Sequence, residues 1–323
     1  TTIDPCMGSG HILVYTFDVL MQIYESAGYG QRDAAESILE NNLYGLDIDD
    51  RAFQLAYFAV MMKARQHNRR ILNSEHKPNV YSIQESNVID RNQLKFFGEG
   101  LSETEKKCAI EQMNGLLDTF QDAKEYGSIL TVDSYDWELL NRFVSKGEML
   151  GQISMDTVGL DDTAEELKQL IAQGKVIAHK YDMYTTNPPY LALSSSSPKL
   201  YDYLKKQYPV GRNDLYAAFI ERGIRFAKQN GFVAMITQHS WMFLSRSTDL
   251  RIEILHNDIC NMVHLGTRAF EDIGGEVVQT VSFVIRKNRM ETFKGSYVRL
   301  VDYSSQSEKE NAFFGQKNKY ITR

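Results

Sequence analysis

Two polar loops, each directly after a short apolar strand, constrain the fold of this chain more than any other feature. The first loop is residues 4–10 (DPCMGSG), and the second is residues 187–190 (NPPY), which follows a predicted strand at 182–186. Further strands are predicted at 42–48, 80–84, 231–237, 259–265 and 277–286, and they alternate with amphipathic helices at 11–23, 51–65 and 214–228. This alternation predicts an α/β fold with a mainly parallel sheet and helices on both faces.

One long segment interrupts the alternation. Residues at about 88–178 are charged and show mostly helical patterns, with Ser102 and Glu105 spaced as a capping box. We therefore predict one catalytic domain over residues 1–323 that carries a helical insertion at about 88–178. The sequence begins at Thr1 without methionine, and its first residues read as the tail of a core strand, so we expect a fragment of a longer protein.

The composition argues against several other classes of protein. No run of about 18 apolar residues is present, and residues 1–20 lack the basic start of a signal peptide, so we expect no membrane association. The three cysteines lie far apart without a CxxC motif, which predicts a cytoplasmic protein. The seven histidines form no metal-binding pattern, so no metal is expected. A net charge of −6 requires a local basic face for any contact with nucleic acid.

The first loop has the glycines of a ligand-binding turn. Gly8 and Gly10 follow a strand and open a helix, so the backbone can approach a ligand and present amide groups to it. A dinucleotide-binding G-x-G-x-x-G pattern would need glycine where Leu13 stands, and no Gly-Lys-Ser/Thr follows as in a P-loop. A ligand-binding loop and a plain structural turn both remain open.

Asp47 ends the second predicted strand. At that position of a βαβ unit, an acidic side chain can accept both hydroxyl hydrogens of a ribose. The alternative role is an N-cap of the following helix, for which Asp49 and Asp50 are better placed.

The second loop is the more specific signal. Pro188 and Pro189 cannot continue a strand ladder, so they hold the loop rigid at the carboxyl edge of the sheet, where ligands of α/β proteins bind. Asn187 offers a side-chain carbonyl, Pro188 a backbone carbonyl, and Tyr190 a flat ring. Together they suit a planar group that bears an NH2, although a turn of this composition can also arise by chance.

The motifs DPCMGSG, GLDID and NPPY, in this order, resemble the amino-methyltransferase pattern of N6-adenine DNA methyltransferases. Their context, with YDMYTTNPPYL, NDLYAAFIERGIRFAKQNGFVAMIT and FEDIGGEVVQTVSFVIRK, is similar to the large adenine methyltransferases of restriction and BREX-type phage-resistance systems. The resemblance covers nearly the whole chain apart from the helical insertion. It implies the class I S-adenosylmethionine-dependent methyltransferase fold, with a Rossmann-like sheet of seven strands, the last of them antiparallel.

The resemblance also implies roles for individual residues. Catalysis is expected from Asn187, Pro188, Pro189 and Tyr190. Residues of the first loop are expected to bind the methionine part of the cofactor: Asp4, Pro5, Cys6, Gly8, Ser9 and Gly10. Asp47 is expected to bind the ribose, and Ile48 to pack on the adenine face. Either Gln84 or Glu85, with Glu85 preferred, is expected to meet the adenine amine. Tyr190 and Phe270 are expected to face the substrate base.

The implied reaction is methyl transfer from S-adenosylmethionine to the N6 amine of an adenine that has flipped out of double-stranded DNA. Other subunits of a restriction-modification or phage-defence system would be further partners. Lys199, Lys205, Lys206 and Arg212, interleaved with tyrosines after NPPY, predict either phosphate contacts or a solvated helix face. Other activities remain open: N4-cytosine methylation, which favours serine in place of Asn187, protein glutamine methylation, ribosomal RNA guanine-N2 methylation, and a catalytically inactive cofactor-binding subunit.

Overall fold

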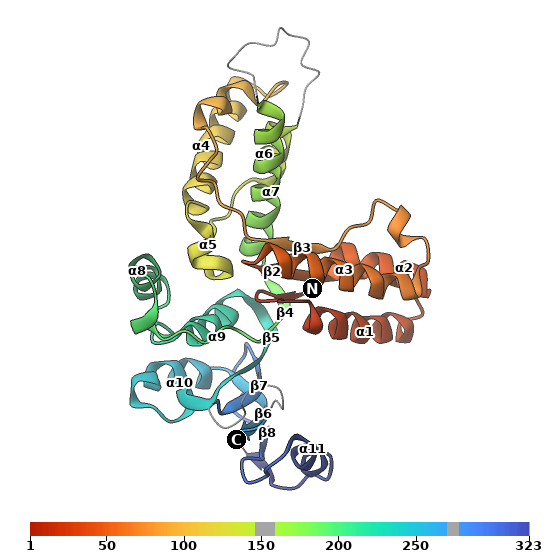
Figure 1. Ribbon diagram of the computed structural model, residues 1–323, viewed down its shortest axis with the longest axis vertical. Helices are drawn as coiled ribbons and strands as arrows, with labels where there is room; N and C mark the ends of the chain where they lie inside the picture. Colours follow the sequence, from red (N-terminus) through yellow and green to blue (C-terminus); the bar gives the residue numbers. More distant parts are fainter. Residues whose placement is uncertain (146–158, 270–277, 323) are drawn as a thin grey trace. The chain divides into compact units, whose positions relative to one another are not determined.

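The computed structural model describes residues 1–145, 159–269 and 278–322 (Figure 1). The chain forms two compact units. Thr1–Val80 and Lys180–Arg323 form one, which we call the sheet unit, and Tyr81–His179 forms the other, the helical unit.

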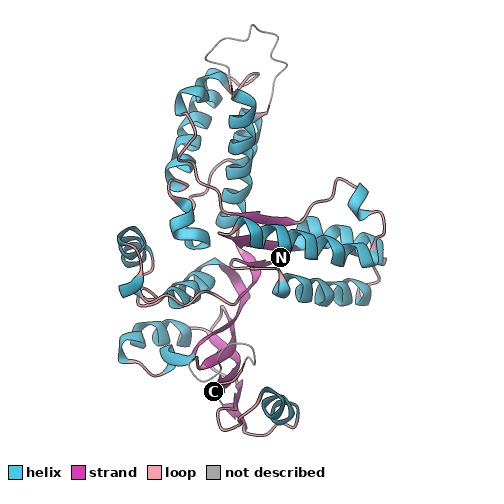
Figure 2. Ribbon diagram, in the orientation of Figure 1, coloured by secondary structure: helices cyan, strands magenta, loops and turns pink. Residues whose placement is uncertain are grey.

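One sheet contains all the strands of the described residues (Figure 2). Its order is β3-β2-β1-β4-β5-β7-β6-β8-β9. β1 pairs in parallel with β2 and β4, and β4 with β5, whereas β7 runs antiparallel between β5 and β6. The strands are β1 Thr2–Asp4, β2 Leu43–Asp47, β3 Asn79–Ser82, β4 Tyr181–Thr186, β5 Ala227–Gln238, β6 Asp258–Gly266, β7 Thr280–Arg286, β8 Gly295–Arg299 and β9 Lys319–Thr322.

The predicted number of seven strands is wrong, because β8 and β9 extend the sheet to nine. β8 pairs in parallel with β6, and β9 in turn pairs antiparallel with β8. Both strands are short and carry few apolar residues, so their sequences lack the pattern of a core strand. They form because each completes the hydrogen bonds of a neighbouring edge.

The helices beside the first strands share one apolar core. The helix α1, His11–Ser26, buries Leu13, Phe17 and Met21 at a spacing of four residues, and α3, Asp50–His67, packs on it. Asp49 caps α3, since its side chain accepts a hydrogen bond from the Arg51 N–H at 2.8 Å. Between them lie α2 Gln31–Ser37 and the π-helical turn η1 Ile38–Asn42, and the 3-10 turn η2 Ile71–Asn73 follows α3.

The described residues in the second half of the sheet unit form four more helices. They are α8 Pro198–Gln207, α9 Leu215–Phe226, α10 Thr248–Leu255 and α11 Gln306–Phe314, with the 3-10 turns η6 Leu193–Ser195, η7 His239–Met242 and η8 Ser245–Ser247. α9 ends two residues earlier than predicted, because Ala227 adopts an extended conformation and begins β5.

The helical unit contains α4 Glu103–Thr119, α5 Ala123–Tyr126, α6 Trp137–Val144 and α7 Leu160–Ala178, with the 3-10 turns η3 Arg91–Phe96 and η4 Gly127–Ile129. The capping box of α4 is present in both directions: the Glu105 N–H donates to the Ser102 side chain, and the Ser102 N–H donates to the Glu105 carboxylate at 2.9 Å. None of the described helices combines the length and the apolar composition that a membrane-spanning segment requires.

Candidate active site

The two predicted loops meet at one edge of the sheet. β1 and β4 are parallel neighbours, so Asp4 at the end of β1 and Asn187 directly after β4 both leave the sheet at its carboxyl edge. Asp47 ends β2 on the other side of β1, in the same direction. This is the edge at which open α/β sheets bind ligands.

A hydrogen bond joins the two loops. The Thr186 hydroxyl donates to Oδ1 of Asp4 at 2.7 Å, and the Cys6 N–H donates to the same oxygen at 3.1 Å. Thr186 and Asp4 are both fully buried, and Thr186 directly precedes Asn187. The residue that starts the glycine loop therefore contacts the residue that precedes the NPPY loop.

The other oxygen of Asp4 is buried without a hydrogen-bond partner among the described residues. Burial raises the pKa of this carboxyl from 3.8 to about 7; the hydrogen bonds from Thr186 and Cys6 lower the pKa, and the charge of Asp47 raises it further. Buried polar atoms are normally satisfied, and a carboxylate in this state favours a cationic partner. The site therefore fits a ligand with a positively charged group, such as the ammonium of S-adenosylmethionine.

The glycines of the loop serve different purposes. Gly10 has φ +87°, and a Cβ there would lie 3.0 Å from the Cα of Ala56, so α1 and α3 could not pack as closely. Gly8 has φ +52°, but a Cβ there would have no atom within 4 Å. Gly10 is thus explained by packing, while the backbone at Gly8 borders open space that a ligand could fill.

Asp47 also binds the glycine loop. Its Oδ2 accepts a hydrogen bond from the Gly8 N–H at 2.9 Å, and its Oδ1 accepts one from the Asp49 N–H at 3.0 Å. Each carboxylate oxygen has a second lone pair, so both can still accept a hydroxyl hydrogen. The next side chain, Ile48, is 51% exposed beside it.

The remaining residues predicted to bind the cofactor, and Phe270, which was predicted to face the substrate base, lie in three places. Pro5 is buried and Cys6 half-buried in the glycine loop, while the Ser9 hydroxyl lies 3.0 Å from Nδ1 of His11. Glu85 belongs to the helical unit, where its carboxylate accepts a hydrogen bond from the Lys124 N–H at 3.2 Å. Phe270 lies outside the described residues.

In the NPPY loop, Asn187 is exposed, Pro188 is buried, Pro189 is exposed and Tyr190 is half-buried. The Tyr190 ring meets the Tyr216 ring edge to face, with centroids 5.8 Å apart and an interplanar angle of 85°. Burial, with smaller contributions from Tyr216 and Asp214, raises the pKa of Tyr190 to about 12, so its hydroxyl stays protonated at neutral pH.

Sequence reasoning missed three groups of the site. They are the Thr186 hydroxyl, the Asp214 carboxylate, which accepts a hydrogen bond from the Leu191 N–H at 3.1 Å, and Tyr216. Position next to NPPY could have drawn attention to Thr186. Asp214 and Tyr216 lie at the start of an amphipathic helix. Asp214 there is explained equally well as the N-cap of the helix, and Tyr216 as a residue of its buried face, so neither points to a site.

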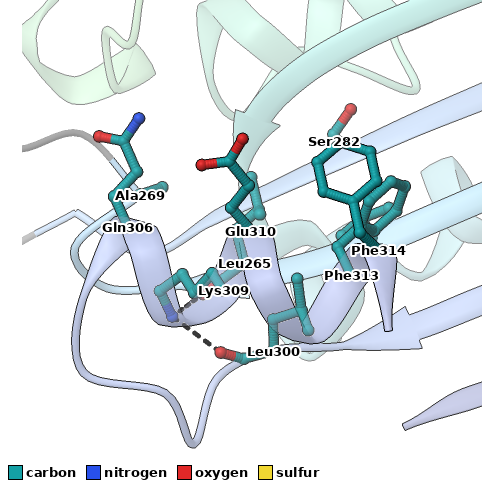
Figure 3. Close-up of a pocket in the computed structure, with 10 residues that line it drawn as sticks. Leu265, Ala269, Ser282, Leu300, Gln306, Lys309, Glu310, Phe313 and Phe314 are labelled. Carbon is teal, nitrogen blue, oxygen red and sulfur yellow. Dashed lines mark hydrogen bonds between the residues drawn. The ribbon is translucent and has the colours of Figure 1, made fainter. Parts of the chain in front are cut away.

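A cavity of about 390 Å³ lies elsewhere in the sheet unit, between α11 and the strands β6 and β7 (Figure 3). Leu265, Leu300, Phe313 and Phe314 supply much of its apolar wall, and the Lys309 ammonium donates to the carbonyls of Leu265 and Leu300. Its lining includes none of the predicted site residues.

Comparisons with known proteins point to one family. Residues 41–270 match the family described as Eco57I restriction-modification methylase. The chain is 45% identical over 317 residues to the adenine-specific methyltransferase PglX of Lacticaseibacillus casei (strain Zhang), and this alignment covers 97% of this chain and 26% of PglX. It is 38% identical over 327 residues to the adenine-specific methyltransferase BrxX of Escherichia coli O9:H4 (strain HS), covering 96% and 27% of the two chains. The chain thus spans about a quarter of the length of these relatives.

Solved structures share the fold. A nuclease-deletion mutant of the Type ISP restriction-modification enzyme LlaGI, in complex with a DNA substrate mimic, superposes with a TM-score of 0.57 at 14% identity, covering 97% of this chain and 22% of that one. The DrdV–DNA complex superposes with a TM-score of 0.55 at 13% identity, covering 99% and 26%. With the family match, these likenesses confirm the predicted fold class, that of class I methyltransferases.

Proposed function

This chain belongs to the family of Eco57I restriction-modification methylases, and on that premise we propose that it is the catalytic part of an S-adenosylmethionine-dependent enzyme that methylates the N6 amine of adenine in double-stranded DNA. The observation that carries the proposal is the hydrogen bond of 2.7 Å between Thr186 and Asp4. It joins a loop suited to a planar NH2 group to a loop whose buried carboxylate suits a cationic cofactor. Both named relatives are adenine-specific methyltransferases, which supports adenine as the substrate base.

In this proposal the glycine loop and the end of β2 hold S-adenosylmethionine, whose sulfonium supplies an activated methyl group. Asp4 binds the ammonium, Asp47 the ribose, and Ile48 packs on the adenine. The backbone of Pro5, Cys6, Gly8, Ser9 and Gly10 surrounds the methionine part. The role of Glu85 at the adenine amine rests on the resemblance to the family alone.

The NPPY loop then acts on the substrate base. The N6 lone pair of adenine is delocalised into the ring, which makes it a poor nucleophile. The Asn187 side-chain oxygen and the Pro188 carbonyl accept its two hydrogens and favour a more tetrahedral nitrogen. Bound S-adenosylmethionine would supply the methyl group, and the two carbonyl oxygens would hold N6 with its lone pair directed at that group until the methylated nitrogen releases one proton to water. The loop thus contributes by positioning and by fixed dipoles.

The base must leave the helix to reach this loop, at a cost of a few kcal/mol. Stacking on Tyr190, and on Phe270 as the second aromatic expected from the family, offsets part of that cost. The basic side chains of α8 are suited to the neighbouring phosphates. Lys199, Lys205 and Lys206 are exposed there, and the Lys205 ammonium lies 4.0 Å from the centroid of the Tyr201 ring. Other subunits of a restriction-modification or phage-defence system are proposed as further partners.

The test is methyl transfer from labelled S-adenosylmethionine to unmethylated DNA by the complete protein as its gene encodes it, followed by digestion and identification of the modified nucleoside. N6-methyladenine should form with the native protein, should be lost in Asn187→Ala, and should persist in Asn41→Ala, an exposed asparagine away from the loop. Labelling of protein or ribosomal RNA instead of DNA would overturn the substrate. Failure to bind S-adenosylmethionine would indicate an inactive subunit.

A further inference from the structure

We propose that Tyr216, on α9, is a positioning residue that holds the Tyr190 ring in the orientation in which it stacks on the extrahelical adenine. This inference rests on the proposed function and adds to it a residue outside the NPPY motif. Its evidence is a set of contacts within the sheet unit that fix both the ring and the backbone of Tyr190.

The ring is fixed from one side by a tyrosine that is itself held at both ends. Tyr216 is only 3% exposed, and its ring meets that of Tyr190 at 85° with centroids 5.8 Å apart. The Tyr216 hydroxyl lies 2.8 Å from the hydroxyl of Ser240, in the turn η7 directly after β5. The Tyr216 ring is therefore held by its helix at Cα and by the neighbouring strand's turn at its hydroxyl. It forms a fixed wall rather than a mobile side chain.

The backbone after Tyr190 is fixed by the start of the same helix. The Leu191 N–H donates to Oδ1 of Asp214 at 3.1 Å, and the Leu191 carbonyl accepts from the Leu215 N–H at 2.9 Å. The Leu193 N–H donates to the Asn213 carbonyl at 3.2 Å. These bonds tie the segment after NPPY to residues 213–215, which directly precede Tyr216 at the start of α9.

Together these contacts leave Tyr190 little freedom. The prolines at 188 and 189 have fixed φ angles, and the bonds at Leu191 hold the chain on the other side. The remaining freedom is rotation of the side chain, which the edge-to-face contact with Tyr216 restricts. Removing that wall should leave the loop in place but let the Tyr190 ring turn away from the stacking orientation.

The experiment compares two variants at position 216 of the complete protein. Tyr216→Met keeps an apolar side chain but removes the ring, and Tyr216→Phe keeps the ring but removes the hydroxyl. A DNA duplex that carries 2-aminopurine at the methylated position, mapped beforehand by sequencing, reports base flipping by its fluorescence. Tyr216→Met should lose much of the flipping signal and about ten- to hundredfold in kcat, with an unchanged affinity for S-adenosylmethionine. Tyr216→Phe should lose a smaller part of both, because the ring stays in place but its hydroxyl no longer contacts Ser240.

Tyr24→Met is the matched control. Tyr24 also has an edge-to-face ring partner, Tyr29 at 5.0 Å, and its hydroxyl also lies 2.8 Å from a serine, Ser37, but it sits on α1 away from the NPPY loop. The inference is overturned if the native protein flips and methylates DNA while Tyr216→Met behaves like Tyr24→Met. A native protein that methylates no DNA would instead refute the proposed function.

Loss of fold must be separated from loss of positioning. Urea unfolding of each variant gives its free energy of unfolding, and only variants that are folded at the assay temperature enter the comparison. If Tyr216→Met is not folded, Ser240→Ala tests the same positioning role of Tyr216, because it removes the contact that holds the hydroxyl end of the ring. It should lower the flipping signal, and the double variant with Tyr216→Phe should lower it no further, since both remove one bond. Full additivity would contradict the proposed contact.

Discussion

Replacing Asp4 by asparagine should make the cofactor-free protein more stable at neutral pH. The asparagine side chain would keep an oxygen that accepts the hydrogen bonds from Thr186 and Cys6, but it cannot ionise. In the native chain the carboxyl is fully buried and one of its oxygens has no hydrogen-bond partner among the described residues. Burial raises its pKa from 3.8 to about 7, so the folded state disfavours the charge that the unfolded chain carries freely.

The sign and size of the effect follow from that shift. An acid with a raised pKa in the folded state contributes its full stability below its unfolded pKa of 3.8 and loses it as the pH rises toward 7. At about 1.4 kcal/mol per pKa unit, the native protein should lose about 2.5 kcal/mol of unfolding free energy between pH 5 and pH 7.5 through this group alone. Asp4→Asn should not lose that part, so the difference between the two proteins should widen by the same amount.

The measurement is urea unfolding at several pH values without cofactor, with the fluorescence of Trp241 as the signal that reports unfolding. Trp241 is buried in the sheet unit, whereas the second tryptophan, Trp137, belongs to the helical unit, so all proteins carry Trp137→Phe. Glu308→Gln is the control, because backbone and side-chain hydrogen bonds from Ser304 hold the pKa of that exposed carboxyl below its usual range. Its effect should be constant from pH 5 to pH 7.5. An equally constant difference for Asp4→Asn would refute the argument from burial.

Three further predictions concern the two loops and the helix α8. The affinity for S-adenosylmethionine, measured by calorimetry, should rise between pH 6 and pH 8 as Asp4 ionises. Thr186→Val should move the midpoint of that rise to higher pH, because the Thr186 hydrogen bond lowers the pKa of Asp4. Thr186→Ser keeps the hydroxyl and should leave the midpoint in place. Gly10→Ala should cost more unfolding free energy than Gly8→Ala, by roughly 1 kcal/mol or more, because both need positive φ but only Gly10 is closely packed; equal losses by urea unfolding would contradict this. Lys205→Gln should weaken DNA binding and reduce the slope of log K against log salt by about 1 if that lysine contacts a phosphate, and an unchanged slope would place it on a solvated face.

The fold class could be predicted because it rests on local patterns. The strand, glycine turn and helix at residues 1–26 lie next to each other in the sequence, and so do β4 and NPPY. The number of strands could not be predicted, because β8 and β9 have little apolar character and exist by pairing with edges formed elsewhere in the chain. The end of α9 was missed for a similar reason. Ala227 has a good helical propensity, but it begins β5 and pairs with Tyr181 of β4.

The site divides in the same way. Sequence order and strand polarity predict that Asp4, Asp47 and Asn187 come to one edge, since these follow from three parallel strands. The bond between Thr186 and Asp4 spans 182 residues and depends on the rotamer of a buried hydroxyl, which no sequence pattern specifies. The contact of Tyr190 with Tyr216 likewise depends on the path of the chain through a loop and a helix between them.

The unsatisfied oxygen of Asp4 connects stability to function. A buried carboxyl that lacks a partner lowers the stability of the free protein at neutral pH, and the hydrophobic core around Phe17 and Val60 has to offset that loss. A cationic ligand that pairs with this oxygen would lower the pKa of Asp4 and recover the lost free energy on binding. Binding should therefore release a proton near pH 7 and stabilise the native protein more at pH 8 than at pH 6. The same carboxyl that weakens the free fold would then provide selectivity for a charged cofactor.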